Sequence, residues 1–144
     1  MGRALLTLVS VIQSAAQAAG RLYEVLVVDG EPDSGEAVKG ILENSIRNVH
    51  VTAVSSGQAG LDVLRDKAVD LIVTDYKMPG MNGLEFLEAA ERIGSKAPRI
   101  LITAFEQELA NEIGSRTRAV VFTKPLEPRP LVRSCQKMLA AGHA

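Results

Sequence analysis

The chain has 144 residues, the length of one domain with little room for a second. Hydrophobic residues make up 47% of it, which argues against a disordered chain, and the 3% of aromatic residues predicts an aliphatic core. The net charge of −1 argues against a nucleic-acid binder that relies on bulk positive charge. One cysteine, Cys135, excludes an internal disulfide and a cysteine-cluster metal site, and no apolar run is long enough for a membrane span.

The first segment, residues 1–21, differs from the rest because it carries almost no charge before Gly20. Its apolar side chains fall on one helical stripe, opposite a polar stripe, which predicts an amphipathic helix. The apolar stripe is Leu5, Leu8, Val9, Ile12, Ala15, Ala16 and Ala19. Such a helix needs a partner surface on this domain, on a second copy in a homodimer, or on another protein. A short secretory signal and extraneous sequence are the alternatives.

The rest of the chain alternates short β-branched runs with helical patterns. Five strands are predicted, at Tyr23–Val28, His50–Val54, Leu71–Thr74, Arg99–Thr103 and Ala119–Thr123. Five helices are predicted, at about 33–47, 57–67, 83–93, 106–114 and 128–141. Ser56 and Asn82 are typical of helix starts, and Gly94 is typical of a helix end. The alternation predicts an α/β domain in which helices cover both faces of a parallel sheet.

Polar side chains follow four of the predicted strands. Asp29 follows the first strand and Asp75 the third, the fourth ends in Thr103, and Lys124 follows the fifth. In an open parallel sheet, ligands bind beyond the carboxyl ends of the strands. We therefore expect two carboxylates, a hydroxyl and an ammonium group to lie at one edge of the sheet.

This set of groups suits a phosphoryl site. A carboxylate can attack phosphorus and hold the group as an acyl phosphate. Mg²⁺ prefers one or two carboxylates together with phosphate oxygens and water, and it would offset the repulsion between the acids and the incoming group. A lysine supplies a compact positive charge, and a hydroxyl donates a hydrogen bond. Each residue alone is weak evidence, because a lone acid after a strand is usually a turn residue. The joint occurrence carries the prediction.

Four segments resemble the response-regulator receiver domain of two-component signalling. They are Val25–Asp29, Asp75–Gly83, Leu101–Ala104 and Phe122–Pro125. The resemblance covers residues 22–141 and leaves 1–21 as an extra segment and 142–144 as a tail. It implies a flavodoxin-like (βα)5 three-layer fold with sheet order 2-1-3-4-5. It also implies that Asp75 accepts the phosphoryl group, that Thr103 and Ala104 surround it, and that Lys124 pairs with it.

The metal site departs from the family pattern. The resemblance implies that Mg²⁺ is held by Asp29, by Asp75 and by the backbone carbonyl of Lys77. The family has two adjacent acids after the first strand, but here the second position is Gly30. Glu31 comes next, and its longer side chain either reaches the metal or faces solvent. We therefore expect weakened metal binding and slower phosphorylation.

Two further positions bear on switching. The family often has an aromatic residue three positions before the lysine, and this chain has Val121 there, with Phe122 beside it. Val121 is then a secondary switch position that follows Thr103 by packing. Lys77 and Phe105 occupy positions where the family tunes loss of the phosphoryl group. Neither is a water-positioning acid or amide, so self-dephosphorylation should be slow.

The resemblance implies a response regulator rather than an enzyme. We expect it to be cytoplasmic and to stand alone, because the sequence ends three residues after Ala141. A histidine kinase or a histidine phosphotransfer protein would donate the phosphoryl group, and a downstream effector protein would read the change. Six basic residues fall within 115–144, and they form either a docking surface or a solvated helix face: Arg116, Arg118, Lys124, Arg129, Arg133 and Lys137.

Two other functions remain open. Gly30 favours an adaptor that keeps the fold but is not phosphorylated. An α/β phosphatase would need a second acid two residues after the nucleophile, and this chain has Lys77 there. No glycine-rich phosphate or dinucleotide loop follows the first strand.

Overall fold

A computed structural model describes residues 20–142 of the chain. The predicted N-terminal helix lies outside the described residues except for its last two positions, as does most of the tail. Among residues 20–142, no helix is both long and apolar enough to cross a membrane.

Strands and helices alternate along the whole described chain. The elements are β1 (Tyr23–Val28), α2 (Pro32–Ser45), β2 (Val49–Val54), α3 (Gly57–Asp66), β3 (Leu71–Asp75), α4 (Gly83–Arg92), β4 (Arg99–Thr103), α5 (Gln107–Thr117), β5 (Val120–Thr123) and α6 (Pro128–Ala141). The five strands form one parallel sheet in the order β2-β1-β3-β4-β5. The predicted flavodoxin-like α/β fold and its strand order are confirmed.

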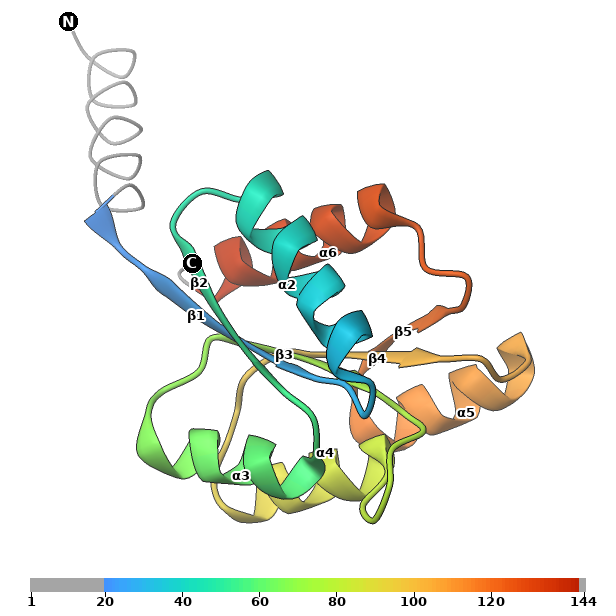
Figure 1. Ribbon diagram of the computed structural model, residues 1–144. Helices are drawn as coiled ribbons and strands as arrows, with labels where there is room; N and C mark the ends of the chain where they lie inside the picture. The colour runs from blue at the N-terminus through green and yellow to red at the C-terminus, as the bar shows by residue number, and fades with distance from the viewer. Residues whose placement is uncertain (1–19, 143–144) are drawn as a thin grey trace, which may run out of the picture.

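The sheet separates two hydrophobic clusters. Helices α2 and α6 lie on one face of the sheet, and α3, α4 and α5 lie on the other (Figure 1). Along β1, Val25 and Val27 belong to the first cluster, whereas Leu26 and Val28 belong to the second. Side chains alternate between the two faces of a strand, and both faces are covered here. This explains why the strands are continuously apolar in sequence.

The helix starts expected from sequence are present. Ser56 caps α3 by accepting a hydrogen bond from the Ala59 N–H at 3.1 Å. Asn82 and Glu85 form a reciprocal capping box at the start of α4, with distances of 2.8 and 3.1 Å. Gly94 adopts φ +97° just after α4 and ends it, as predicted.

Helix α5 is longer than predicted, because it continues to Thr117 instead of ending at Gly114. Gly114 is in fact a packing position: a Cβ there would lie 2.5 Å from Cγ2 of Val121 on β5. The missing side chain lets the helix approach the strand closely. The helix ends at Arg118, which takes the left-handed conformation with φ 57°.

Cys135 is expected to be unreactive in the folded protein. It is fully buried in α6, and burial raises the pKa of its thiol to about 12. Since the thiolate is the reactive form, a thiol-specific disulfide reagent at pH 8 should label Cys135 only after denaturant is added. Rapid labelling of the native chain would contradict this packing.

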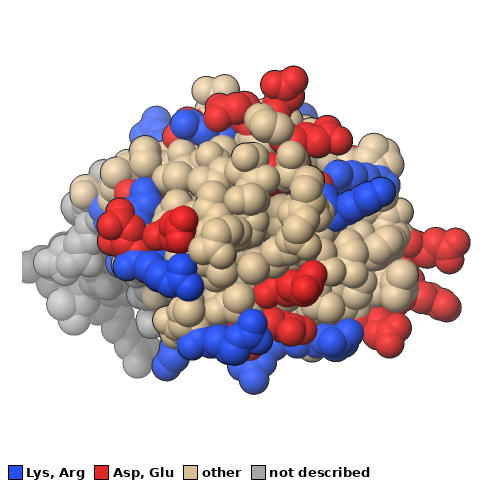
Figure 2. Space-filling model, turned by 60° about the horizontal axis from the view of Figure 1, so that its bottom comes forward, with Lys and Arg blue, Asp and Glu red and all other residues tan. Residues whose placement is uncertain are grey.

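Charges of both signs are mixed on the face that carries α3 and α4. Figure 2 shows acidic and basic side chains spread around a largely uncharged centre on this side of the molecule. This face therefore has no dominant charge, in keeping with the net charge of −1.

Candidate functional site

Asp75 is the last residue of β3, the central strand of the sheet. Its side chain is buried, with the residue only 8% exposed. The Tyr76 N–H donates to Oδ1 at 2.9 Å, and the Lys124 ammonium donates to Oδ2 at 3.2 Å. Both carboxylate oxygens are therefore held in place, one by the backbone and one by the Lys124 ammonium group.

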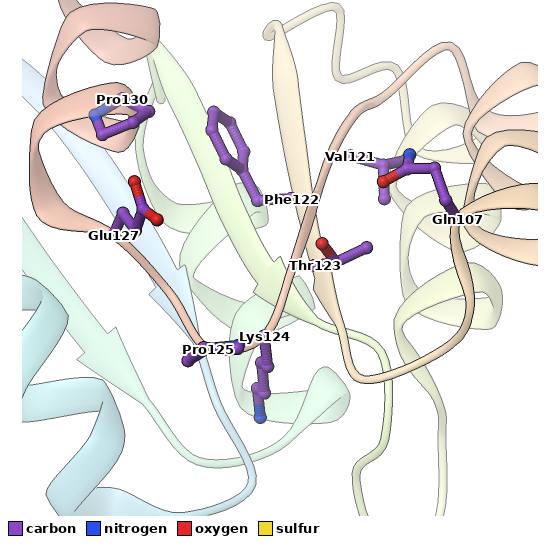
Figure 3. A pocket seen from close by; sticks show the side chains of 8 residues that line it. All are labelled: Gln107, Val121, Phe122, Thr123, Lys124, Pro125, Glu127 and Pro130. Carbon is purple, nitrogen blue, oxygen red and sulfur yellow. The ribbon is translucent and has the colours of Figure 1, made fainter.

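Lys124 follows the edge strand β5. Its backbone N–H donates to the Thr103 carbonyl at 2.8 Å, which ties the end of β5 to the end of β4. Its side chain is 45% exposed and points away from Gln107 on α5 and Pro130 on α6, as Figure 3 shows. The ammonium group thus reaches Asp75 across the carboxyl end of β4.

Asp29 follows β1 and is as buried as Asp75. Its Oδ1 accepts a hydrogen bond from the Glu31 N–H at 2.9 Å. Burial raises the pKa of Asp29, and the charges of Asp75 and Glu31 raise it further, while the Glu31 N–H and Lys124 oppose the shift. Asp29, Asp75 and Lys124 are therefore close enough to interact electrostatically, and the structure brings them to one edge of the sheet.

Thr103 ends β4, the strand beside Asp75, and is 2% exposed. Its Oγ1 accepts a hydrogen bond from the Phe105 N–H at 3.1 Å, so the hydroxyl proton is available to another acceptor. Ala104 is exposed and presents only a methyl group. The end of β4 therefore offers a hydroxyl donor, followed by a small side chain, on the strand next to Asp75.

A buried carboxylate, a cation, a second carboxylate and a hydroxyl thus lie together at one end of a 2-1-3-4-5 sheet. The family model for the response regulator receiver domain matches residues 25–136. The chain belongs to the response-regulator receiver family.

Relatives agree with this assignment. The response regulator receiver protein CpdR of Brucella abortus is 30% identical over 122 residues, which cover 84% of this chain and all of CpdR. The sensor protein GacS of Pseudomonas syringae is 34% identical over 121 residues, which cover 78% of this chain and only 13% of GacS. A CheY-like receiver domain protein from Methanospirillum hungatei superimposes with a TM-score of 0.73 at 25% identity, covering 84% of this chain and 96% of that one. The Francisella response regulator 1452 receiver domain gives 0.75 at 22% identity, covering 83% and 98%.

Two acidic residues of this receiver suit a divalent cation. Asp29 and Asp75 are buried neighbours whose mutual repulsion a cation would relieve. Within residues 20–142, no group of three or more His, Cys, Asp or Glu side chains is placed to hold a metal ion. Mg²⁺ commonly binds one or two carboxylates and completes its shell with water and phosphate oxygens. The residues therefore fit Mg²⁺ with a small set of protein ligands.

The two other predicted metal ligands of the receiver are less directly placed. Glu31 is exposed, and its Oε2 accepts a hydrogen bond from the Ser34 hydroxyl at 3.3 Å. Its carboxylate thus lies over the first turn of α2. Lys77 is exposed in the loop between β3 and α4, where its backbone carbonyl was expected to serve as a ligand. Asp29 and Asp75 are therefore the ligands that the geometry supports most directly.

Gly30 has a packing role that the sequence did not reveal. A Cβ at this position would lie 2.9 Å from Cδ of Pro79 and 3.3 Å from Cα of Met78. The loop after β3 therefore packs against the turn after β1, where the family's second acid would project. The only signal in the sequence is that the two segments follow strands that are neighbours in the sheet.

An aromatic contact was also missed. The rings of Tyr76 and Phe105 meet edge to face, with centroids 4.7 Å apart and an angle of 62° between planes. Val121 packs on the same face of the sheet as this pair, whereas Phe122 points to the opposite face, toward α6 (Figure 3). Phe105 therefore places an aromatic ring on the face of the sheet that α3, α4 and α5 cover. Val121 lies on this face but is not aromatic, and Phe122 is aromatic but lies on the other face.

A pocket of about 380 Å³ lies along β5, between α5 and α6 (Figure 3). Its lining residues are Gln107, Val121, Phe122, Thr123, Lys124, Pro125, Glu127 and Pro130. Lys124 and Val121 belong both to this pocket and to the predicted switch residues. The receiver therefore has a hollow next to the groups that should respond to phosphorylation.

Asp29→Asn is expected to stabilise the receiver at neutral pH in the presence of a chelator. The folded-state pKa of Asp29 is raised above its ordinary 3.8, so stability is lost as pH rises from that value through the folded-state pKa. Asparagine removes this loss while keeping an acceptor for the Glu31 N–H. The melting temperature should rise by a few degrees at pH 7, and the gain over the parent chain should disappear below about pH 3. An equal gain at both pH values would contradict the electrostatic cause.

Proposed function

We propose that this receiver is a phosphoryl-accepting switch that takes the group onto Asp75 from a phosphohistidine. The donor is a histidine kinase or a histidine phosphotransfer protein. The observation that carries the proposal is the buried Asp75 carboxylate, held 3.2 Å from the Lys124 ammonium and adjoining Asp29. The similarity to the response regulator receiver protein CpdR supports this role.

The chemistry follows from the placement of these groups. An Asp75 oxygen attacks phosphorus, and the phosphorus–nitrogen bond of the donor breaks, with its electrons leaving on the histidine nitrogen. Lys124 moves its contact from Asp75 to a phosphoryl oxygen, which offsets the added negative charge. The Thr103 hydroxyl donates to a second phosphoryl oxygen. Asp29 and Asp75 would hold Mg²⁺, and the ion would supply further positive charge at the site.

The response reaches the surface through the segment after β4. Thr103 moves toward the phosphoryl group and takes with it Phe105, whose N–H it binds at 3.1 Å. The Phe105 ring contacts Tyr76, which adjoins Asp75 in the chain. Phosphorylation thus biases the arrangement of this loop and of α5, which begins two residues later.

The partner surface in this proposal is the α5–β5–α6 side of the molecule. Leu109 and Val120 are exposed apolar residues there, at 45% and 42%. On α6, Arg129, Arg133 and Lys137 are exposed and spaced four residues apart, so they lie on one stripe of the helix. An effector with apolar contacts flanked by acidic residues would fit this surface.

The test is intact mass after incubation with acetyl phosphate, with Mg²⁺ or with a chelator. The expected result is a Mg²⁺-dependent gain of one phosphoryl group that is absent in Asp75→Asn. Phosphorylated imidazole is included as a second donor, because its phosphorus–nitrogen bond is of the same type as the bond in a phosphohistidine. No gain from either donor would overturn the proposal.

The second candidate is an adaptor that keeps the receiver fold without being phosphorylated. The packing of Pro79 over Gly30 favours it, because this contact occupies the place of a family metal ligand. Tyrosine fluorescence separates the two functions, since the chain has two tyrosines and no tryptophan. In a Tyr23→Phe variant, Tyr76 reports alone from beside Asp75. A response to beryllium fluoride with Mg²⁺ would support the switch, and no response would support the adaptor.

A further inference from the structure

A buried arginine lies at the end of the sheet opposite Asp75. Arg99 begins β4, four residues before Thr103, so the two Cα atoms are about 13 Å apart along the strand. Arg99 is only 6% exposed. Its Nε and Nη2 donate to the Ala97 carbonyl at 3.1 and 3.0 Å, and Nη2 also donates to the Ser95 carbonyl at 3.3 Å. The guanidinium group is thereby fixed in the turn between α4 and β4.

One nitrogen of this group has an ion-pair partner but no hydrogen bond. Within residues 20–142, Nη1 of Arg99 is buried and has no hydrogen-bond acceptor. The Glu91 carboxylate forms an ion pair with Nη1, with Oε1 3.3 Å away, and the Glu91 side chain is 47% exposed. A buried donor without an acceptor costs stability, so Nη1 is a position where an added acceptor would be favourable. Glu91 covers it only loosely, from the surface.

The arginine lines a pocket of about 340 Å³ with an excess of positive charge. Lys96 and Arg118 line it as well, against the single acid Glu91, and Ser95 and Pro98 complete much of the wall. Arg118 is held there by its left-handed conformation at the end of α5. Burial lowers the pKa of Arg99, Glu91 opposes this, and the charge of Arg118 adds to it. Three cations therefore line this pocket, two from the segment that leads into β4 and one from the end of α5.

We propose that this pocket binds a small oxyanion of the phosphate type, and that Glu91 is its displaceable intramolecular occupant. The pocket carries an excess of two positive charges, which matches a dianion. A tetrahedral oxyanion presents oxygens in several directions, so it can satisfy Nη1 of Arg99 and contact Lys96 and Arg118 at once. The site is separate from the phosphorylation site, because it lies at the opposite ends of the strands.

The test is a titration of the full chain with inorganic phosphate, followed by calorimetry or by amide chemical shifts at constant ionic strength. Saturable binding is expected, and Arg118→Ala or Lys96→Ala should weaken it about tenfold. Arg116→Ala is the matched control: it removes the same charge from the same helix, but Arg116 pairs with Glu88 at 3.7 Å and does not line the pocket. All three variants change exposed residues, so the fold should be retained.

Glu91→Gln provides the sharpest result. Removing the competing carboxylate should tighten phosphate binding several-fold if Glu91 occupies the site. A purely structural clasp between Arg99 and Glu91 would give no such gain. Asp75→Asn should bind phosphate as the parent does, which separates this pocket from the phosphorylation site. Equal affinities of Arg118→Ala and Arg116→Ala, or the absence of saturable binding, would overturn the proposal.

Discussion

Lys124→Ala is expected to slow phosphoryl uptake from acetyl phosphate by about 10²-fold, with the fold retained. Lys124 is the only cation with an ion pair to Asp75 among residues 20–142, at 3.2 Å. Without it, no cation among the described residues is paired with Asp75 to offset the charge that builds up on the phosphoryl oxygens. The fold should persist because the side chain is about half exposed and the backbone bond to Thr103 does not depend on it. Intact mass against time gives the rate.

Two variants separate position from charge. Lys137→Ala removes the same charge from the exposed surface of α6 and should react at the parent rate. Lys124→Arg keeps the charge but replaces a compact ammonium group with a planar fork, so an intermediate rate is expected. If Lys124→Ala and Lys137→Ala reacted equally fast, Lys124 would have no role in the transfer.

The meeting of Asp75 and Lys124 could be predicted from the sequence although 49 residues separate them. Parallel strands place their carboxyl ends at one edge, so residues that follow different strands become neighbours. The same rule brought Asp29 and Thr103 to this edge. It required only the strand positions, and those follow from runs of β-branched residues such as Val25–Val28.

Contacts that depend on how loops pack could not be predicted in the same way. Gly30 appeared in the sequence only as a missing acid, but it also allows the close approach of Pro79. The edge-to-face contact of Tyr76 with Phe105 depends on the course of two loops. Periodicity and strand order do not specify such courses, because loop conformations are set by tertiary packing.

Arg99 shows a related limit. An arginine at the first position of a strand is ordinarily exposed, since a buried charge must be compensated. Here the turn after α4 provides the carbonyls of Ser95 and Ala97, which allow the guanidinium group to be buried. This compensation comes from the backbone, and backbone carbonyls carry no sequence signal.

Gly30→Asp alone is expected to leave Mg²⁺ affinity unimproved and to destabilise the fold by about 1–3 kcal/mol. The new Cβ would lie 2.9 Å from Pro79 Cδ, closer than atoms normally approach. Gly30 is not among the glycines with positive φ, so the obstacle is space and not backbone conformation. Denaturant unfolding measures the stability. The fluorescence of Tyr76 in the Tyr23→Phe background measures Mg²⁺ binding.

Combining Gly30→Asp with Pro79→Ala should reverse the result and tighten Mg²⁺ binding at least about tenfold over Pro79→Ala alone. Removing the proline ring frees the space, and the new carboxylate then joins Asp29 and Asp75. Gly30→Asn in the same background has the same size without the charge, so it should not tighten binding.

If Gly30→Asp alone bound Mg²⁺ as tightly as the double variant, the loop that carries Pro79 would have to move aside at little cost. The receiver's incomplete acid pair would then be a simple loss of a ligand. If only the double variant gained, Gly30 and Pro79 together would set the metal affinity of this receiver, and hence the rate at which Asp75 is phosphorylated.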